Sequence, residues 1–376
     1  MKENKKIWLS SPHMGGEEMV CVKEAFDTNW IAPIGPHITR FEEGISKLSR
    51  GANVAALSSG TAAIHLALIL AGVQRSDDVI CSSFTFSASA NPIKYIGANP
   101  IFIDSEEETW NMCPDLLHKA ILDGVRNNKK PKAIILVHLY GMPAKIDAII
   151  TLANKFDIPI IEDAAEALGS KYKDQALGTF GSFGIYSFNG NKIITTSSGG
   201  AIISTNKKQI QKAKFLSTQA RDEACHYQHS EVGYNYRMSN VCAAIGIGQL
   251  EVLSERVHKK REIFNFYKNQ LQIKEISFLE ESNQSFSNYW LTTILLDKNS
   301  PIDRERLRLH LEKDNIESRP LWKPMHLQPV FSQCKSYVNG VSEDLFKRGL
   351  CLPSGTNMDE QDLERVVRQV EELYKV

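Results

Sequence analysis

The stretch "FGIYSFNGNKIITTSSGGAIIST" (residues 183–205) joins two apolar runs through a polar loop that carries a single lysine, Lys192. The runs "FGIYSF" (183–188) and "GAIIST" (200–205) are rich in β-branched and aromatic residues, which is typical of buried strands. Small hydroxyl residues and glycines fill the loop between them. An ammonium at the end of two interior strands is either a solvated loop residue or an amine held in a pocket for chemistry.

Five further apolar runs precede this stretch, and most are separated by segments with apolar residues three and four positions apart, such as Thr61 to Gly72 and Ala144 to Phe156. The runs are "NVAAL" (53–57), "DVICSS" (78–83), "PIFID" (100–104), "KAIILVHL" (132–139) and "IPIIED" (158–163). Continuous Val/Ile/Leu runs indicate strands covered on both faces. We therefore predict an α/β fold with a seven-stranded, mostly parallel sheet and helices on both of its faces.

The pattern changes after residue 205. A long helical region is predicted from about Ser239 to Gln270, interrupted by nothing stronger than Gly246 and Gly248. Beyond it, strand-like runs ("EISFLE", "NYWLTTILL") alternate with helical ones ("PIDRERLRLHLEKDN"). This organisation predicts a large domain over residues 1–260 and a smaller C-terminal α+β domain over residues 261–376.

The composition narrows the class of protein. Forty-four Lys and Arg residues balance 44 Asp and Glu residues, so the chain has no net charge that would favour binding to nucleic acid or to an anionic membrane. The seven cysteines form no C-x-x-C pair, and the N-terminus lacks the apolar core of a signal peptide. We therefore expect a cytoplasmic protein without a membrane segment. Cys225, His226 and His229 lack a fourth ligand, so no metal site is predicted.

Ligands of open α/β sheets bind beyond the carboxyl ends of the strands, so we examined the residues that follow each run. "SSGT" (58–61) opens a helix and is either an anion-binding turn or a plain helix cap. Glu162, Asp163 and Glu166 follow an apolar strand, where a carboxylate needs a cation or hydrogen-bond donors, unless Asp163 caps a helix. Phe84 and Phe86 offer either core packing or a flat face for a ring, and we expect one of them in the core.

An anion cradle, a buried acid, an aromatic face and a lone lysine together suit an anionic aromatic heterocycle with a carbonyl group. Pyridoxal phosphate is such a molecule. Gly60, Thr61 and Ser187 would bind its phosphate, Asp163 would pair with its pyridinium nitrogen, and Lys192 would form a Schiff base with its aldehyde.

Four motifs, in this order, resemble the nucleotide-sugar aminotransferases of the DegT/DnrJ/EryC1/StrS family: "SSGTAAIHLAL", "EDAAEALGS", "YSFNGNK" and "GYNYRMSNVCAAIGIGQL". The resemblance covers nearly the whole chain and implies the fold-type-I architecture of pyridoxal-phosphate-dependent transferases. The flanking stretches "SPHMGGEE", "NWIAPIGPHITRFEE", "RPLWKPMHLQPVF" and "CLPSGT" are most similar to the transaminases that make UDP-4-amino-4,6-dideoxy-N-acetylglucosamine in bacillosamine biosynthesis.

The resemblance assigns roles to single residues. It implies Lys192 as the Schiff-base lysine and Asp163 as the partner of the ring nitrogen. Glu166 would lie near the phenolic oxygen of the ring, where many members carry glutamine or histidine, and Phe86 would lie on the ring. Asn235 or Arg237 would reach the phosphate in the partner subunit. The run "TTSSGG" after the lysine departs from the family, which often has an acidic residue there. The implied substrate-binding residues are Asn29, Trp30, Ile31, Ala32, Arg319, Trp322, Lys323 and His326.

The function implied by the resemblance is a homodimeric transaminase with shared active sites, which moves the amino group of L-glutamate to C4 of UDP-2-acetamido-2,6-dideoxy-4-hexulose. One alternative is a perosamine-type transaminase that acts on a GDP-4-keto-6-deoxy sugar. A second alternative is a related deoxygenating dehydrase. Such enzymes carry histidine at the position of Lys192, so the lysine argues against this alternative. A cofactor-binding regulatory protein is expected to carry an added DNA- or effector-binding domain, and the sequence shows no sign of one.

Overall fold

The computed structural model describes residues 4–375 and is built around one large sheet. Its eight strands, in spatial order, are β1 (Asn53–Leu57), β9 (Gly200–Ser204), β8 (Phe183–Ser187), β5 (Ile160–Asp163), β4 (Ala133–Val137), β2 (Asp78–Ser82), β3 (Asn99–Ile103) and β14 (Lys335–Tyr337). Only β9 runs against its neighbours, and it pairs antiparallel with both β1 and β8. The carboxyl ends of the other strands therefore meet at one edge.

The structure confirms the predicted α/β fold and the mostly parallel sheet. All seven predicted strands are present, and β8 and β9 are joined by the loop that carries Lys192. An eighth strand, β14, pairs parallel with β3 and comes from the C-terminal part of the chain. It has three residues, of which only Tyr337 is buried. Such a short strand leaves no apolar run in the sequence to indicate it.

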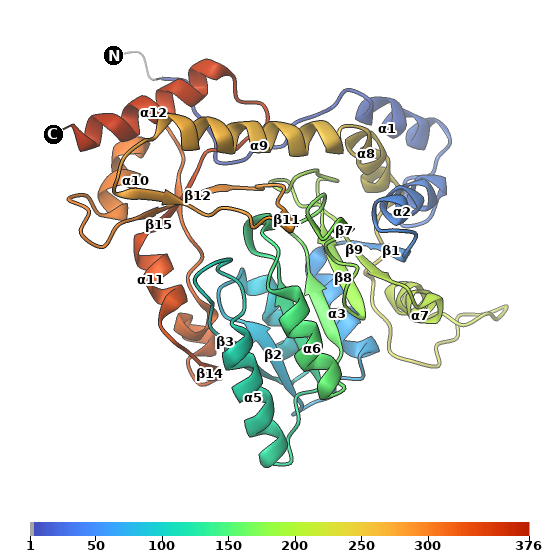
Figure 1. Cartoon of the computed structure of the whole chain (residues 1–376). Coiled ribbons are helices and arrows are strands. Elements are labelled where there is room, and N and C mark those ends of the chain that lie inside the picture. Colours follow the sequence, from blue (N-terminus) through green and yellow to red (C-terminus); the bar gives the residue numbers. More distant parts are fainter. Residues whose placement is uncertain (1–3, 376) are drawn as a thin grey trace.

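Helices cover both faces of the large sheet (Figure 1). Alternate residues of each strand face opposite helical layers, as Ile134 and Ile135 of β4 do. One face packs on α3 (Gly60–Leu70), α4 (Asn91–Tyr95) and α7 (Lys207–Ser217). The other face packs on α2 (Pro36–Leu48), α5 (Pro114–Arg126), α6 (Ile146–Lys155) and α8 (Asn240–Glu251).

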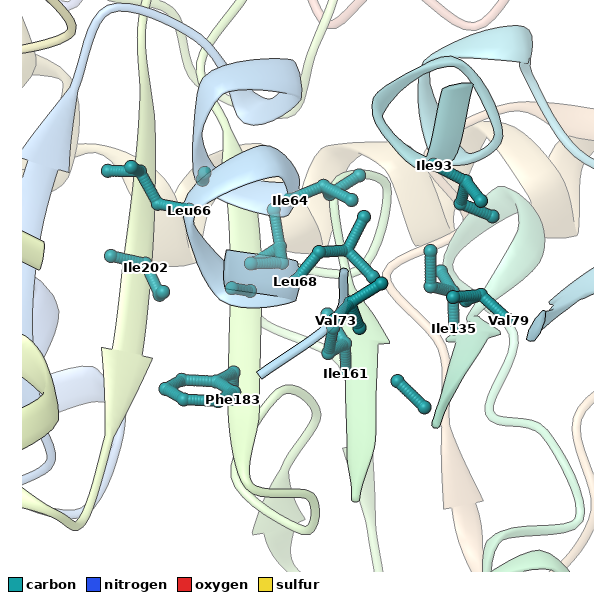
Figure 2. Close-up of a cluster of buried hydrophobic side chains, with 14 of the residues drawn as sticks. Ile64, Leu66, Leu68, Val73, Val79, Ile93, Ile135, Ile161, Phe183 and Ile202 are labelled. Carbon is teal, nitrogen blue, oxygen red and sulfur yellow. The ribbon is translucent and has the colours of Figure 1, made fainter. Parts of the chain in front are cut away.

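Figure 2 shows the first of these cores, in which Ile64 and Leu68 of α3 lie over the side chains of the strands. Ile161 and Ile202 are fully buried in this cluster. Burying one such side chain contributes roughly 1.5–3 kcal/mol, so the core holds α3 firmly against the sheet. The start of α3 is thereby fixed at the carboxyl edge of the strands.

The predicted helix from Ser239 to Gln270 is wrong in one respect, because the structure divides it into α8 and α9 (Leu253–Gln270). The break lies at Val252, not at either glycine. A Cβ on Gly246 would lie 2.5 Å from the ring of Phe41, and one on Gly248 would lie 2.7 Å from the backbone of α1 (Glu18–Asp27). The two glycines thus allow close helix packing and do not interrupt the helix.

A smaller antiparallel sheet forms the second layer of the C-terminal part, with strands β10 (Ile276–Phe278), β12 (Thr292–Leu296), β15 (Gly349–Leu352) and β13 (Arg319–Pro320). The helices of this part are α10 (Arg304–Lys313), α11 (Val341–Arg348) and α12 (Glu360–Tyr374). Ile7, near the N-terminus, is buried in the same core. We propose a domain division near residue 260, within α9, which spans both parts (Figure 1).

The remaining short elements lie in connections. A three-stranded sheet consists of β6 (Lys171–Tyr172), β7 (Gln175–Ala176) and β11 (Ser285–Phe286). The 3-10 turns are η1 (Ser87–Ser89), η2 (Leu139–Gly141), η3 (Met325–Leu327) and η4 (Pro329–Phe331). Among residues 4–375 there is no helix with the length and apolar character needed to cross a bilayer.

Candidate active site

A cavity of about 320 Å³ opens at the carboxyl edge of the large sheet. It collects side chains from the ends of several strands and from the first turn of α3. Its lining includes all seven of the residues that the sequence assigns to a cofactor within one chain: Gly60, Thr61, Phe86, Asp163, Glu166, Ser187 and Lys192. These residues are separated by up to 132 positions in the sequence, and the parallel strands bring them together.

Lys192 lies in the loop between β8 and β9 with its side chain 13% exposed. Its Nζ is 3.5 Å from Oε1 of Glu166 and 4.1 Å from the centroid of the Trp290 ring. The indole N–H of Trp290 donates to the carbonyl of Asn191 at 2.7 Å, which fixes the ring beside the lysine. The lysine is therefore held in a pocket and is not a solvated loop residue.

Asp163 ends β5 and is 6% exposed. Its Oδ2 accepts a hydrogen bond from Ser89 Oγ at 2.6 Å, and its Oδ1 accepts one from the backbone N–H of Ala165 at 3.1 Å. Ser89 Oγ in turn lies 2.8 Å from Thr85 Oγ1. The described chain after Asp163 forms turns and not a helix, so this carboxylate is no helix cap. It is a buried acid that lines the cavity.

Glu166 is the second buried acid of the cavity. The backbone N–H of Tyr140 donates to its Oε2 at 2.7 Å. Burial raises the pKa of Glu166, and the nearby Lys192 and the Tyr140 N–H act in the opposite direction. Tyr140 adopts a left-handed backbone conformation (φ 53°) that is uncommon for residues other than glycine.

Glu162, the third acid of this region, serves the fold. Its Oε1 accepts backbone hydrogen bonds from Phe180 at 2.6 Å and Gly181 at 2.5 Å, and its Oε2 accepts one from Gly178 at 2.9 Å. The same Oε2 is 3.0 Å from Nε2 of the buried His138. These contacts tie the loop before β8 to the sheet.

The first turn of α3 forms a cradle suited to an anion. Ser59 is the helix cap, and its Oγ accepts the backbone N–H of Ala62 at 3.0 Å. A Cβ on Gly60 would lie 3.2 Å from Cβ of Ser187, and one on Gly200 would lie 2.3 Å from the backbone of Ser59. Glycines at these positions let two strands and a helix start converge. N–H groups in the first turn of a helix lack intrahelical partners and attract anions.

One of the two phenylalanines after β2 lies in the core, as expected, and the other faces the cavity. Phe84 is 2% exposed and belongs to a core cluster, whereas Phe86 is 52% exposed and lines the cavity. The centroid of the Phe86 ring lies 5.2 Å from that of Trp322. Phe86 therefore presents an aromatic face to the cavity beside a second aromatic side chain.

A second cavity of about 730 Å³ adjoins the first, and the two share Asn191, Trp290 and Trp322 in their linings. Tyr140 lies between the two tryptophans, with ring planes 17° from that of Trp290 and 10° from that of Trp322. The Tyr140 hydroxyl accepts the backbone N–H of Trp322 at 3.0 Å. Arg319 also lines the second cavity, where its guanidinium is 2.7 Å from Oε1 of Glu317. These three aromatic side chains line the second cavity, and the two tryptophans also line the first.

The sequence did not indicate several residues of the site, namely Ser89, Asn191 and Trp290 around the first cavity and Trp8, Ser10, Ser11 and Tyr140 around the second. The tryptophans of "KIWLSSP" and "SNYWLTT" are the one signal that could have indicated them, because Trp is uncommon and often lines binding sites. Their distance in sequence from Lys192 hid the connection.

Some of the residues that the sequence assigns to the site lie outside both cavities of a single chain. His326 Nδ1 is 2.6 Å from Ser83 Oγ, and Lys323 contributes to neither cavity lining. Asn235 is exposed, while Arg237 pairs with Glu42 at 2.6 Å. Residues 29–32, between α1 and α2, are exposed, and the backbone carbonyls of Trp30 and Ala32 accept hydrogen bonds from Asn240.

Fold and cavity together define a pyridoxal-phosphate-dependent transferase of fold type I. The sequence model described as the DegT/DnrJ/EryC1/StrS aminotransferase family matches residues 12–371. "Putative pyridoxal phosphate-dependent aminotransferase EpsN" of Bacillus subtilis (strain 168) is 52% identical, over 99% of this chain and 96% of its own. GDP-perosamine synthase of Escherichia coli O157:H7 is 38% identical, over 98% of this chain and 99% of its own. A crystal structure of a DegT DnrJ EryC1 StrS aminotransferase from Brucella abortus matches with a TM-score of 0.89 at 26% identity, over 95% of both chains.

The chain belongs to the DegT/DnrJ/EryC1/StrS aminotransferase family. Its cofactor is pyridoxal phosphate, and it is an aminotransferase of the sugar class. These findings confirm the family, the fold type and the cofactor predicted from the sequence.

Proposed function

We propose that this enzyme transfers the amino group of L-glutamate to C4 of a nucleotide-linked 4-keto-6-deoxy sugar, with UDP-2-acetamido-2,6-dideoxy-4-hexulose as its substrate. The product would be UDP-4-amino-4,6-dideoxy-N-acetylglucosamine. The observation that carries the proposal is the position of Lys192 Nζ, 3.5 Å from Glu166 and 4.1 Å from the ring centroid of Trp290, in a cavity that also contains Asp163.

The residues of the smaller cavity fit pyridoxal phosphate. The cradle at Gly60, Thr61 and Ser187 would hold the phosphate, because the start of α3 favours an anion and a Cβ on Gly60 would crowd Ser187. Asp163 would hold the protonated ring nitrogen, and Lys192 would hold the aldehyde. When bound, the cofactor supplies a carbonyl that carries the amino group and a ring that accepts electrons.

The protein's own groups move and hold protons. Lys192 Nζ would take the proton from the α-carbon of the amino donor and deliver it to the cofactor carbon on the other side of the transferred nitrogen. Trp290 limits where that amine can lie, because its ring is fixed by the hydrogen bond to Asn191. Glu166 Oε1, 3.5 Å from Lys192 Nζ, would stabilise the positive charge of the lysine ammonium between the two proton transfers. The second half of the reaction runs the same steps in reverse on the keto sugar.

The larger cavity supports a substrate of nucleotide-sugar size. Its volume of about 730 Å³ lies within the range of pockets that bury such ligands, and it shares Asn191 and Trp322 with the smaller cavity. A sugar carbonyl near Lys192 would leave the nucleotide in this space, where Arg319 offers a guanidinium to a diphosphate. Aromatic walls suit the flat faces of a base.

A GDP-linked 4-keto-6-deoxy sugar is the second candidate substrate. The observation that favours it is the 38% identity, over 98% of this chain, with GDP-perosamine synthase of Escherichia coli O157:H7. The chemistry at Lys192 would be the same for both substrates, and only the base and the substituent at C2 of the sugar would differ.

A homodimer with shared sites is the proposed assembly. Large apolar side chains of α1 and of the segment that follows it, including Met19, Phe26, Trp30, Ile31 and Ile34, are exposed in the single chain. An exposed apolar surface of this extent is typical of a protein interface. Residues 29–32 would then line the partner's substrate cavity. Asn235 would reach the partner's phosphate site, since Arg237 is already paired with Glu42.

The test is to incubate the holoenzyme with L-glutamate and, in separate reactions, UDP- and GDP-linked 4-keto-6-deoxy sugars, and to read the products by mass spectrometry. Efficient amination of the UDP-linked 2-acetamido sugar is expected, and Lys192→Ala should form no product. Preferred amination of the GDP-linked sugar would show that the second candidate, and not the UDP-linked sugar, is the substrate. Amination of neither sugar would contradict the proposal.

A further inference from the structure

A second lysine, Lys260, lies fully inside the protein in the middle of α9 and is 2% exposed. Its Nζ donates three hydrogen bonds: to Trp290 C=O at 2.7 Å, to Ser354 C=O at 2.9 Å and to Ser10 Oγ at 3.0 Å. An ammonium has three N–H donors, so every donor has an acceptor. Burial is the only cause that lowers its pKa, to about 7, and no carboxylate among residues 4–375 pairs with it.

A buried cation without a paired anion is costly, and a methionine of similar length would fill the same space without that cost. The three acceptors therefore point to a connecting role. They come from three segments that are distant in sequence, namely the N-terminus, the segment before β12 and the segment after β15. The side chain of Lys260 joins all three.

Residues 8–14, which we call the N-terminal strap, form one wall of the larger cavity through Trp8, Leu9, Ser10, Ser11 and Pro12. None of these residues lines the smaller, cofactor-binding cavity. The strap is held beside the C-terminal segment because the N–H of Ser354 donates to the carbonyl of Leu9 at 2.7 Å.

Two of the contacts made by Lys260 connect it, through one further residue each, to the loop that carries Lys192. Ser10 Oγ, which accepts from Lys260, donates to the carbonyl of Asn191 at 3.3 Å. Trp290, whose carbonyl accepts from Lys260, donates from its indole to that same carbonyl and places its ring 4.1 Å from Lys192 Nζ. Both contacts therefore end on the residue that precedes the catalytic lysine.

We propose that Lys260 is a positioning residue that fastens the N-terminal strap and Trp290 to the Lys192 loop, and so shapes the keto-sugar side of the active site. The inference rests on the proposed function for the identity of the substrate. The amino donor is small and reacts in the cofactor cavity, whereas the nucleotide-sugar needs the wall that the strap provides. Loss of Lys260 should therefore affect the second half-reaction more than the first.

The experiment compares Lys260→Met with the wild type and with Arg304→Met. Arg304 is a matched control, because it is a half-buried cation whose guanidinium donates to the carbonyl of Phe346, outside the linings of both cavities. For Lys260→Met we expect a KM for the keto sugar at least about tenfold higher. The rate of the glutamate half-reaction, followed by the visible absorbance of the cofactor, should change by less than about twofold. Lys260→Arg, which restores N–H donors at this position, should bring the KM for the keto sugar part of the way back to the wild-type value.

Limited proteolysis of the holoenzyme in the absence of sugar and amino donor supplies a readout that is independent of the substrate. Cleavage within residues 8–14 should be faster in Lys260→Met than in the wild type or Arg304→Met. If Lys260→Met fails to fold, Ser10→Ala removes one acceptor on the strap and should show the same faster cleavage.

Equal losses in both half-reactions, or an unchanged KM with only the lower melting temperature that Arg304→Met also shows, would overturn the inference. Unchanged cleavage of the strap would overturn it as well. If the wild type aminated neither sugar, the proposed function would fail, but the proteolysis would still decide whether Lys260 fastens the strap.

Discussion

Replacing Asp163 by asparagine separates the charge of this side chain from its shape. The amide is almost the same size as the carboxylate, and its oxygen can still accept the N–H of Ala165. Its NH₂ group can donate to Ser89 Oγ, whose own proton can turn toward Thr85 Oγ1, 2.8 Å away. The hydrogen bonds of the folded chain therefore survive, and stability should change by no more than about 1 kcal/mol.

Turnover should fall far more than stability. An amide carries no charge, so it cannot keep a proton on the cofactor's ring nitrogen. Breaking a buried ion pair by removing one partner costs roughly 3–5 kcal/mol, and each 1.36 kcal/mol is about a factor of ten in rate. Asp163→Asn should therefore lower kcat on the order of 10²- to 10⁴-fold while the cofactor stays bound through Lys192 and the phosphate cradle.

The assay measures single-turnover rates of both half-reactions together with thermal unfolding. Glu162→Gln is the control, since it changes a buried carboxylate one residue earlier that bonds Gly178, Phe180 and Gly181. That variant should lose about 1–3 kcal/mol of stability with little loss of turnover. Near-normal activity of Asp163→Asn, or a loss no greater than that of Glu162→Gln, would refute the role assigned to Asp163.

Three further predictions follow from single contacts. Burial lowers the pKa of Lys260 to about 7, whereas an unfolded lysine keeps its proton to about pH 10.4. Between these pH values the unfolded chain binds more protons, so stability should rise with pH by about 1.4 kcal/mol per unit, and urea titrations of Lys260→Met should lack this contribution. Arg319→Ala should raise the KM for the keto sugar more than it lowers kcat, whereas Lys323→Ala, outside both cavities, should leave KM unchanged in steady-state assays. Mixing inactive Lys192→Ala with a weakened Asn235→Ala should restore some activity, because heterodimers would contain one intact site; a mixture no more active than its parts would argue against shared sites.

The sheet and the cofactor side of the site could be predicted from the sequence because their signals are local. Continuous apolar runs mark strands that are buried on both faces, and the polar residues after them must meet at one edge of a parallel sheet. Asp163 ends such a run, and Gly60 and Lys192 lie a few residues after one, so the sequence shows their environment.

Other features depend on contacts between distant segments. Trp290 lies beside Lys192 only because the segment before β12 folds over the Lys192 loop. Lys260 stands in "RVHKKREIF", a charged run that reads as a solvated helix face, yet its position on α9 turns it inward. The break at Val252 was missed because no glycine or proline marks it in the sequence, and the two glycines nearby serve helix packing.

Peptide mapping shows which lysine carries the cofactor, and Lys192 is the lysine expected. The holoenzyme is reduced with borohydride, digested, and analysed by mass spectrometry for the peptide that holds the reduced cofactor. We predict a single modified peptide that contains Lys192, and none from Lys192→Ala. Modification of Lys260, the other buried lysine beside Trp290, or of the surface residues Lys171 or Lys173, would contradict the assignment on which the whole account rests.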